Sequence, residues 1–299
     1  MRIDPNMVPE MLANLQQSQV QLNTALQEVA TGLSVNQPSD NPTSAAAMVE
    51  NTIATRDLDI YTQNVSTSLA TVQTASSVLS SVVTSLTSAV SAGTEGANGT
   101  NNSNDLAALA SEVQGILTSV VTAANTSMSG TYVFGGTGTT TPYTADASSS
   151  TGYTYNGNSD TNSVVIGDNT SVQISLPGSQ IFSSSSNNVL GALSSLVTAL
   201  KGGNSADIQT ATASVSSALN YVGQQQVFYG NAETQLNSQE TFLGQDKVTL
   251  SMQANSLVGV NESTAATDLS QAETDNSAAL AAVAKVMPNT LLNYLAPPA

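Results

Sequence analysis

The chain has 299 residues, enough for about two domains. Five Lys and Arg residues oppose 21 Asp and Glu residues, which gives a net charge of -16 although only 9% of the residues are charged. So few cations cannot coat phosphates or anionic lipid. The chain also has no Cys, His or Trp, so thiolate and imidazole zinc sites, Ser-His nucleophiles and imidazole proton shuttles are excluded. We therefore expect no enzyme, no metal or cofactor, no small-molecule substrate and no nucleic-acid partner.

Hydropathy gives no sign of a membrane protein. Mean hydropathy is -0.01, and the apolar run at residues 278–284 is far shorter than the roughly 20 residues that a bilayer requires. The first residues lack the continuous apolar stretch of a cleavable secretory signal. We expect no membrane contact, and the missing cysteines leave the redox compartment open.

Residues 8–33 predict a coiled-coil-like helix, because apolar side chains recur at alternating spacings of four and three. Pro38 and Pro42 follow it and should separate it from the next helix, which Asn41 or Ser39 could cap. The apolar positions are Val8, Leu12, Leu15, Leu22, Leu26, Val29 and Leu33.

The next segments predict a helical hairpin followed by strands. A heptad register from Leu58 to Leu86 indicates one long helix over about 43–92, and a third helix begins near Asp105, after a turn rich in Gly and Asn. Residues 130–188 instead show short alternating runs separated by turn residues, which is typical of β-hairpins.

Helical spacing returns at Val189, and a register of seven residues runs from Val215 to Leu257 with a polar second seam. A final helix follows Glu262, and Pro288 should end or kink it.

We therefore predict a mainly α protein: an elongated rod of antiparallel long helices with an inserted small β domain and coiled-coil terminal helices. The predicted segments are an N-terminal coiled-coil segment and linker (1–42), a helical hairpin (43–129), the inserted β domain (130–188), the returning helices (189–260) and a C-terminal coiled-coil segment (261–299).

Candidate chemistry is weak throughout. The run Gly135 to Thr139 lacks the third glycine, the lysine and the following helix of a phosphate loop, so we interpret it as a turn. Carboxylates that are two or seven residues apart on a helix do not come close to each other. The run from Asp160 to Asp168 does not match a calcium-binding loop. We assign no catalytic, cofactor-binding or metal-binding residue.

The apolar stripes have two interpretations. In the middle helices they are the ordinary core of a bundle. Neither terminal helix can bury its stripe alone, and their outer faces are neutral, so there we favour packing surfaces between identical chains. The predicted packing residues are Val8, Leu12, Leu15, Leu22, Leu26, Val29, Leu269, Leu280, Val283, Met287, Leu291 and Tyr294.

Two motifs resemble the flagellin superfamily. The first is ATGLSVNQPSDNPTSAAAM (30–48), in which Gly32, Asn36 and Asp40 occupy the pattern, although Ser34 stands where a basic residue is common. The second is NTSMSGTYVFGGTGTTTPYT (125–144), which is similar to the hook-associated protein type 3 branch. Its motif residues are Asn125, Tyr132, Phe134, Gly135 and Gly136.

The resemblance implies a structural subunit of the bacterial flagellum at the hook-filament junction, secreted unfolded by type III export and folded at the growing tip. It implies four partners: copies of itself, hook-associated protein type 1, flagellin and an export chaperone. Three alternatives stay open: filament flagellin, a secreted adhesin-like surface protein, and a carboxylate glycosidase domain grafted onto flagellin, which would need paired acids in the 130–188 region.

Overall fold

The computed structural model describes the backbone of residues 7–295 and the side chains of residues 9–285. Within those residues, seven helices and six short strands follow one another, so the prediction of a mainly helical fold with a small β region is confirmed. The chain forms two compact units, residues 1–57 with 245–299 (unit 1) and residues 58–244 (unit 2).

The elements are α1 (Met7–Thr31), α2 (Pro42–Gly96), α3 (Ser103–Ala124), β1 (Ser127–Met128), β2 (Thr131–Tyr132), β3 (Tyr143–Ala145), β4 (Tyr153–Tyr155), β5 (Ser163–Gly167), β6 (Thr170–Gln173), α4 (Gly178–Ile181), α5 (Val189–Gly202), α6 (Ser205–Val258) and α7 (Glu262–Leu295).

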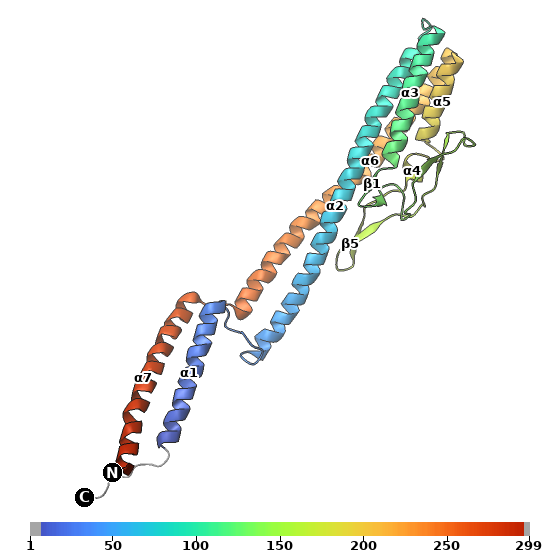
Figure 1. Ribbon diagram of the computed structural model, residues 1–299. Coiled ribbons are helices and arrows are strands. Elements are labelled where there is room, and N and C mark those ends of the chain that lie inside the picture. The colour runs from blue at the N-terminus through green and yellow to red at the C-terminus, as the bar shows by residue number, and fades with distance from the viewer. Residues whose placement is uncertain (1–6, 296–299) are drawn as a thin grey trace. The chain divides into compact units, whose positions relative to one another are not determined.

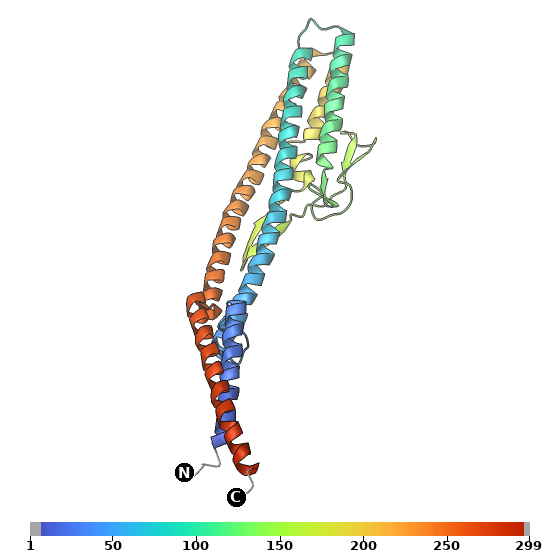
Figure 2. The same cartoon turned by 60° about the vertical axis from the view of Figure 1, so that its left-hand side comes forward.

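Unit 2 has a helical core built from the predicted heptads. The helices α2, α3, α5 and α6 lie side by side there (Figures 1 and 2), and α3 contacts α5 along its length. Their seam residues are fully or almost fully buried, because each helix turns one apolar stripe toward the others. This core includes Val65, Val72, Leu79 and Leu86 of α2, Val113 and Leu117 of α3, Leu193 and Leu196 of α5, and Val215, Val222, Tyr229 and Leu236 of α6.

Two glycines bring α2 close to its neighbours at the α2–α3 end of the bundle. A methyl group added at Gly93 would overlap the hydroxyl of Thr212 on α6, and one added at Gly96 would overlap Leu200 on α5. The missing side chains therefore allow an approach that alanine would prevent. The turn rich in Gly and Asn that the sequence predicts lies between Gly96, the last residue of α2, and Ser103, the first residue of α3.

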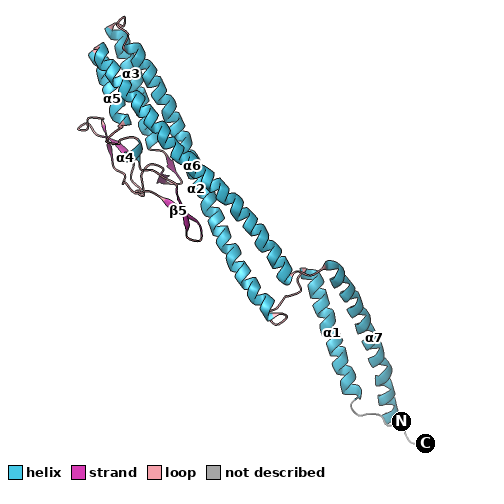
Figure 3. Cartoon of the chain, turned by 180° about the vertical axis from the view of Figure 1, so that it is seen from behind, coloured by secondary structure: helices cyan, strands magenta, loops and turns pink. Residues whose placement is uncertain are grey.

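The β region consists of three separate antiparallel hairpins: β1 with β2, β3 with β4, and β5 with β6. Their buried residues join the same hydrophobic cluster as the helices. The β5–β6 hairpin lies against α2 and α6 (Figure 3), and side chains of both helices hold its backbone. Asn64 of α2 donates to the Val165 carbonyl at 3.0 Å, and Gln239 of α6 donates to the Ile166 carbonyl at 2.9 Å. The hairpins are thus docked on the helical bundle.

An asparagine side chain caps the N-terminus of five of the helices. The side chains of Asn41, Asn102, Asn188, Asn204 and Asn261 each accept a hydrogen bond from a backbone N–H in the first helical turn, at 2.8–3.3 Å. An asparagine in this position satisfies a donor that the helix leaves unpaired. Of the two predicted caps for the second helix, Asn41 is the one used.

Pro288 was expected to end or kink the last helix. It does not end α7, which continues to Leu295, and a kink stays a prediction. A proline inside a helix removes one N–H donor, and the helix accommodates that loss.

By length and composition alone, α2 and α3 are apolar enough to cross a membrane. In this fold part of that apolar surface lies in the core of unit 2. Leu106, Val113, Leu117 and Val120 of α3 are buried, as are Val65, Val72, Leu79 and Leu86 of α2.

Candidate assembly surface

The helices α1 and α7 of unit 1 run antiparallel along each other (Figures 1 and 3). The buried residues of this pair are small: Ser18, Ala25 and Ala265 are at most 8% exposed. Because small residues fill the contact, the two helices bury few large apolar side chains between them. The pair leaves most of its leucines and valines toward solvent.

The predicted packing residues fall into three groups. Leu12, Leu26, Val29 and Leu280 are 44–48% exposed. Four more are half-buried: Leu15, Leu22, Leu269 and Val283. The side chains of Val8, Met287, Leu291 and Tyr294 lie outside the described residues. The role of all twelve in subunit packing stays a prediction.

Sequence reasoning missed one residue of this surface. Val20 is 63% exposed, the largest exposure among the large apolar side chains described. It stands beside Gln19, which interrupts the heptad seam, so a search restricted to seam positions passes over it. Val20 lies outside that seam, so the exposed apolar side chains of α1 are not confined to one stripe.

Two buried polar atoms weaken the helix pair. Ser18 Oγ and Asn276 Oδ1 have no hydrogen-bond partner among the residues that the structure describes. A buried polar group without a partner costs about 1–3 kcal/mol. The pair buries mainly small residues, so apolar side chains of α1 and α7 remain exposed.

A shallow groove of about 410 Å³ lies between α1 and α7. Three carboxylates line it: Glu28 of α1, and Asp268 and Asp275 of α7. Gln271 donates to Asp275 at 2.9 Å. Apolar lining comes from Val20, Ala25 and Ala272. The groove is thus acidic with an apolar floor.

The first family motif forms a compact loop after α1. Gly32 adopts a positive φ of 70°, which favours glycine and ends the helix. The side chain of Asn36 donates to the Leu33 carbonyl at 2.8 Å. One carboxylate oxygen of Asp40 accepts from the backbone N–H groups of Asn36 and Gln37, at 3.0 and 2.8 Å. The three motif residues therefore shape one turn.

This loop is held against the end of α6. Ser34 N–H donates to the Val258 carbonyl at 2.7 Å, and Val260 N–H donates to the Gly32 carbonyl at 3.0 Å. The Ser34 hydroxyl also donates to Val258 at 3.1 Å. Ser34 stands where the superfamily often has a basic residue, and here its role is to join the two linkers of unit 1.

The second family motif joins α3 to the strands through Asn125. Its amide donates to the Tyr143 carbonyl and accepts from the Tyr143 N–H, both at 2.8 Å. The side chain thus pairs with β3 as a neighbouring strand would. The Tyr143 hydroxyl donates to the Gly178 carbonyl at 2.8 Å, and burial raises the pKa of this phenol above its usual range.

We expect Asn125→Ala to destabilise unit 2 by about 1–3 kcal/mol, because both backbone groups of the nearly buried Tyr143 lose their partner. Urea unfolding followed by circular dichroism measures the loss. Asn237→Ala, on the exposed face of α6, is the matched control and should stay within about 0.5 kcal/mol. Equal stability of the two variants would contradict this account.

Phe134 is the apolar anchor of the same motif. Its ring is fully buried and meets Phe182 and Tyr229 edge to face, with centroid distances of 5.3 and 6.5 Å. Its carbonyl accepts from Gly178 N–H at 2.7 Å and from the Tyr155 hydroxyl at 3.0 Å. The residue fixes the β region to α4 and α6 at one point.

The remaining motif residues set the chain path around this anchor. Gly136 has a φ of 70°, and an added methyl group would overlap the side chain of Asn158. Gly135 is tightly placed, since an added methyl would lie 3.1 Å from Tyr132. The Tyr132 hydroxyl pairs with Thr141 at 3.0 Å. The glycine run predicted as a turn is therefore a close-packed loop, and Asn158 holds it by accepting from Thr137 N–H at 2.8 Å.

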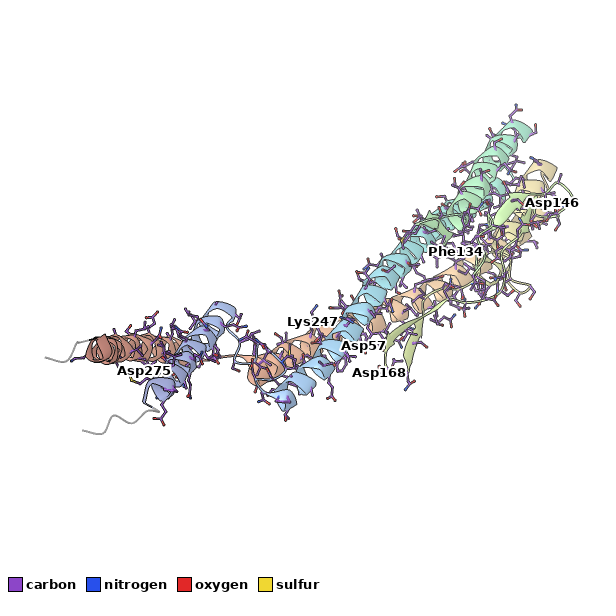
Figure 4. The ribbon with its side chains drawn as sticks, turned by 60° about the horizontal axis from the view of Figure 1, so that its bottom comes forward. Asp57, Phe134, Asp146, Asp168, Lys247 and Asp275 are labelled. Carbon is purple, nitrogen blue, oxygen red and sulfur yellow. The ribbon has the colours of Figure 1, made fainter. Side chains whose placement is uncertain are left out.

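Asp146, in the exposed β3–β4 loop (Figure 4), is the carboxylate with the clearest electrostatic shift. Hydrogen bonds from the Ser148 hydroxyl, the Thr154 hydroxyl and the Ser148 N–H hold its pKa at about 2. Since the charged form is favoured, these bonds are present above the usual carboxyl pKa of about 3.9 and are lost as the pH falls through about 2.

We expect Ser148→Ala to raise the pKa of Asp146 toward that usual value, because the largest contribution to its lowered pKa comes from this hydroxyl. An NMR titration of the side-chain carboxyl carbon measures it. Ser150→Ala, in the same loop, should leave the pKa at about 2. An unchanged titration in Ser148→Ala would show that the loop does not hold this geometry.

In the part of the chain that the structure describes, no three side chains of Asp or Glu converge as metal ligands. Asp160, for example, accepts hydrogen bonds from the Asn158 amide at 2.9 Å and from the Thr137 hydroxyl at 3.3 Å. Its carboxylate therefore helps to hold the close-packed glycine loop. The surface that stands out is the apolar and acidic face of α1 and α7.

In chain order, long terminal helices with exposed apolar side chains precede and follow a helical bundle with docked hairpins, which defines a class of mainly helical proteins with a small β region. Residues 6–139 match the bacterial flagellin N-terminal helical region. This match begins just before α1 and extends beyond β2; it includes the first motif (30–48) and residues 125–139 of the second. This part of the chain is therefore similar to the N-terminal helical region of flagellin.

Solved structures extend the likeness beyond that region. A candidate flagellar hook-associated protein from Vibrio parahaemolyticus has a TM-score of 0.67 at 19% identity, covering 74% of this chain and 100% of that one. The flagellar hook associated protein-3 from Legionella pneumophila has a TM-score of 0.64 at 14% identity, covering 70% and 98%. The flagellar junction protein FlgL from Legionella pneumophila has a TM-score of 0.59 at 14% identity, covering 72% and 100%. A search of curated protein sequences gave no match. The chain has the fold of flagellar hook-associated proteins.

Proposed function

We propose that this chain is a structural subunit of the bacterial flagellum that forms the junction between hook and filament. The observation that carries the proposal is the pairing of this fold with terminal helices that leave large apolar side chains exposed. One structure with the same fold is that of a flagellar junction protein. Burial of the exposed stripes against neighbouring copies would supply the free energy of assembly, at about 25 cal/mol per Å² of apolar surface.

The proposal assigns different tasks to different segments. The terminal segments 1–42 and 261–299 would mediate assembly, and the segment 130–188 would face outward. Hook-associated protein type 1 and flagellin would be the axial neighbours, and an export chaperone would cover the apolar stripes before secretion. Because the terminal pair buries mainly small residues, its ordering would be coupled to contact with neighbours.

Filament flagellin is the second candidate, since the matching N-terminal region is that of flagellin. The second motif and the solved structures support the junction role instead.

We expect deletion of the gene to leave hooks without filaments and to release monomeric flagellin into the medium, because flagellin would have no surface on which to assemble. Electron microscopy of the cells and immunoblotting of the medium measure both. A deletion strain that lacks filaments and releases no flagellin would favour the flagellin alternative. Normal filaments in the deletion strain would contradict both roles.

A further inference from the structure

The sequence contains two Asn-Gly pairs, Asn98-Gly99 and Asn156-Gly157. An asparagine side chain reacts with the backbone nitrogen of the next residue most readily when that residue is glycine, which has no side chain to block the approach and leaves the backbone wide freedom. The two pairs have the same local chemistry. The fold places them in different surroundings, so their reactivity should differ.

The first pair lies in the turn between α2 and α3, at one end of the helical bundle of unit 2 (Figure 2). Both residues are exposed, and a methyl group added at Gly99 would meet no atom within 4 Å. Within the described part of the chain, the side chain of Asn98 and the N–H of Gly99 have no hydrogen-bond partner. The side-chain carbonyl carbon and the nitrogen that would attack it are thus open to solvent.

The backbone of Asn98 is held by two hydrogen bonds that leave these groups untouched. Its N–H donates to the Glu95 carbonyl at 3.1 Å, and its carbonyl accepts from the Asn101 N–H at 3.3 Å. The second bond is long, since N–H···O bonds usually measure about 2.9–3.0 Å. The peptide group that joins Asn98 to Gly99 can therefore rotate without the loss of a strong bond.

The second pair is fixed in place, although Asn156 is also exposed. Its side chain donates to the Thr144 hydroxyl at 2.7 Å, and its carbonyl accepts from the Thr140 hydroxyl at 3.2 Å. Gly157 is close-packed, because an added methyl group would overlap the Tyr155 hydroxyl. A reaction at Asn156 has to break both hydrogen bonds and move a packed glycine.

We propose that Asn98 is a site of spontaneous deamidation and that the fold protects Asn156. The nitrogen of Gly99 loses its proton to solvent base and attacks Cγ of Asn98. A C–N bond forms, and the side-chain NH₂ group takes up a proton and leaves as ammonia. One water molecule then opens the five-membered succinimide. Opening at Cγ gives aspartate, and opening at the backbone carbonyl gives isoaspartate; nothing is oxidised or reduced.

Either product changes the turn between the two helices. Aspartate and isoaspartate both add a carboxylate three residues after Glu95, which is exposed. Isoaspartate also adds a methylene to the main chain, four residues before Asn102 caps α3. Modified copies accumulate with the age of the chain, because the reaction needs no enzyme. It needs no neighbouring copy either, so it is independent of the proposed function.

Incubation of the purified full chain at mildly alkaline pH, followed by proteolysis and mass spectrometry, measures the reaction at both sites. Each event raises the peptide mass by the difference between an oxygen atom and an NH group, and labelling by an isoaspartate methyltransferase detects isoaspartate. We expect Asn98 to react at least about tenfold faster than Asn156, which corresponds to about 1.4 kcal/mol between the two barriers. In urea the two rates should converge, because the fold no longer protects Asn156.

Two variants separate the contributions of sequence and fold. Gly99→Ala fits without strain, since the site is open and the φ of Gly99 is not positive, and it should slow the reaction at Asn98 several-fold. Thr144→Val removes the hydroxyl that accepts from the Asn156 side chain. It should speed the reaction at Asn156 and leave Asn98 unchanged. Circular dichroism checks that both variants are folded.

Equal rates at the two sites of the folded chain, or a faster reaction at Asn156, would overturn the proposal. So would an unmodified Asn98 in a folded chain whose urea-unfolded form reacts, because the turn would then be protective. A tenfold difference that persists in urea would show that the flanking sequence, and not the fold, protects Asn156.

Discussion

Leu26→Asp should abolish filament growth while leaving the chain folded. Leu26 is 45% exposed on α1, so the change breaks few contacts within the chain. In the assembled flagellum the same position would be buried against a neighbour, and an unpaired charge there costs several kcal/mol. Complemented deletion cells should therefore carry bare hooks and release flagellin, as measured by electron microscopy and immunoblotting of the medium.

The matched control is Gln27→Asp, which adds the same charge and a similar loss of helix propensity one residue away. Gln27 is exposed and polar, so we expect filaments of normal number. The purified Leu26→Asp chain should unfold in urea within about 0.5 kcal/mol of the natural one, as surface substitutions usually do. Normal filaments with Leu26→Asp would contradict the role of this helix face in assembly.

The structure decides which seam residue makes the cleaner test. The heptad pattern alone treats Leu22 and Leu26 as equivalent, because both lie on the predicted stripe. Leu22 is half-buried and Leu26 is exposed. A charge at Leu22 would therefore disturb unit 1 itself, whereas a charge at Leu26 tests the contact with neighbours.

Most helices could be predicted from sequence because their signals are local. The apolar period, the prolines after residue 37 and the asparagine caps place α1, α2 and α3 within a few residues of their observed bounds. The sequence suggested that Pro288 could end the last helix, but α7 continues past it to Leu295. A proline removes one hydrogen bond from a helix, and the neighbouring residues can still continue it.

The docking of the β region could not be predicted, because it depends on contacts between distant residues. The alternation near residues 164–172 predicts a hairpin but not its docking by Asn64 and Gln239. Likewise, the pairing of Asn125 with Tyr143 and the contact of Phe134 with Tyr229 join residues 18 or more positions apart. The exposed side chains of Val49 and Ile53 on α2 and of Val248 and Met252 on α6 were also missed, since periodicity predicts a helix and not which face stays uncovered.

Phe134→Ala should be among the most destabilising single changes in unit 2. Its ring is fully buried against Phe182 and Tyr229, and removing it leaves a cavity that these two rings cannot fill without shifting. Losses of this kind cost about 3–5 kcal/mol. Urea unfolding should show a lower midpoint, and hydrogen exchange should become faster in the β hairpins before the helices, because Phe134 fixes the hairpins to α6.

Phe242→Ala makes the same chemical change at an exposed site of unit 2, where the ring is 53% exposed. Because little apolar surface is lost there, the free energy of unfolding should change by less than about 1 kcal/mol. A difference of several kcal/mol between the two variants isolates burial as the cause. Equal losses would mean that the hairpins are held mainly by backbone hydrogen bonds such as Gly178 to Phe134. In that case Asn125→Ala, which removes two hydrogen bonds between a side chain and the backbone of Tyr143, should be the more damaging change.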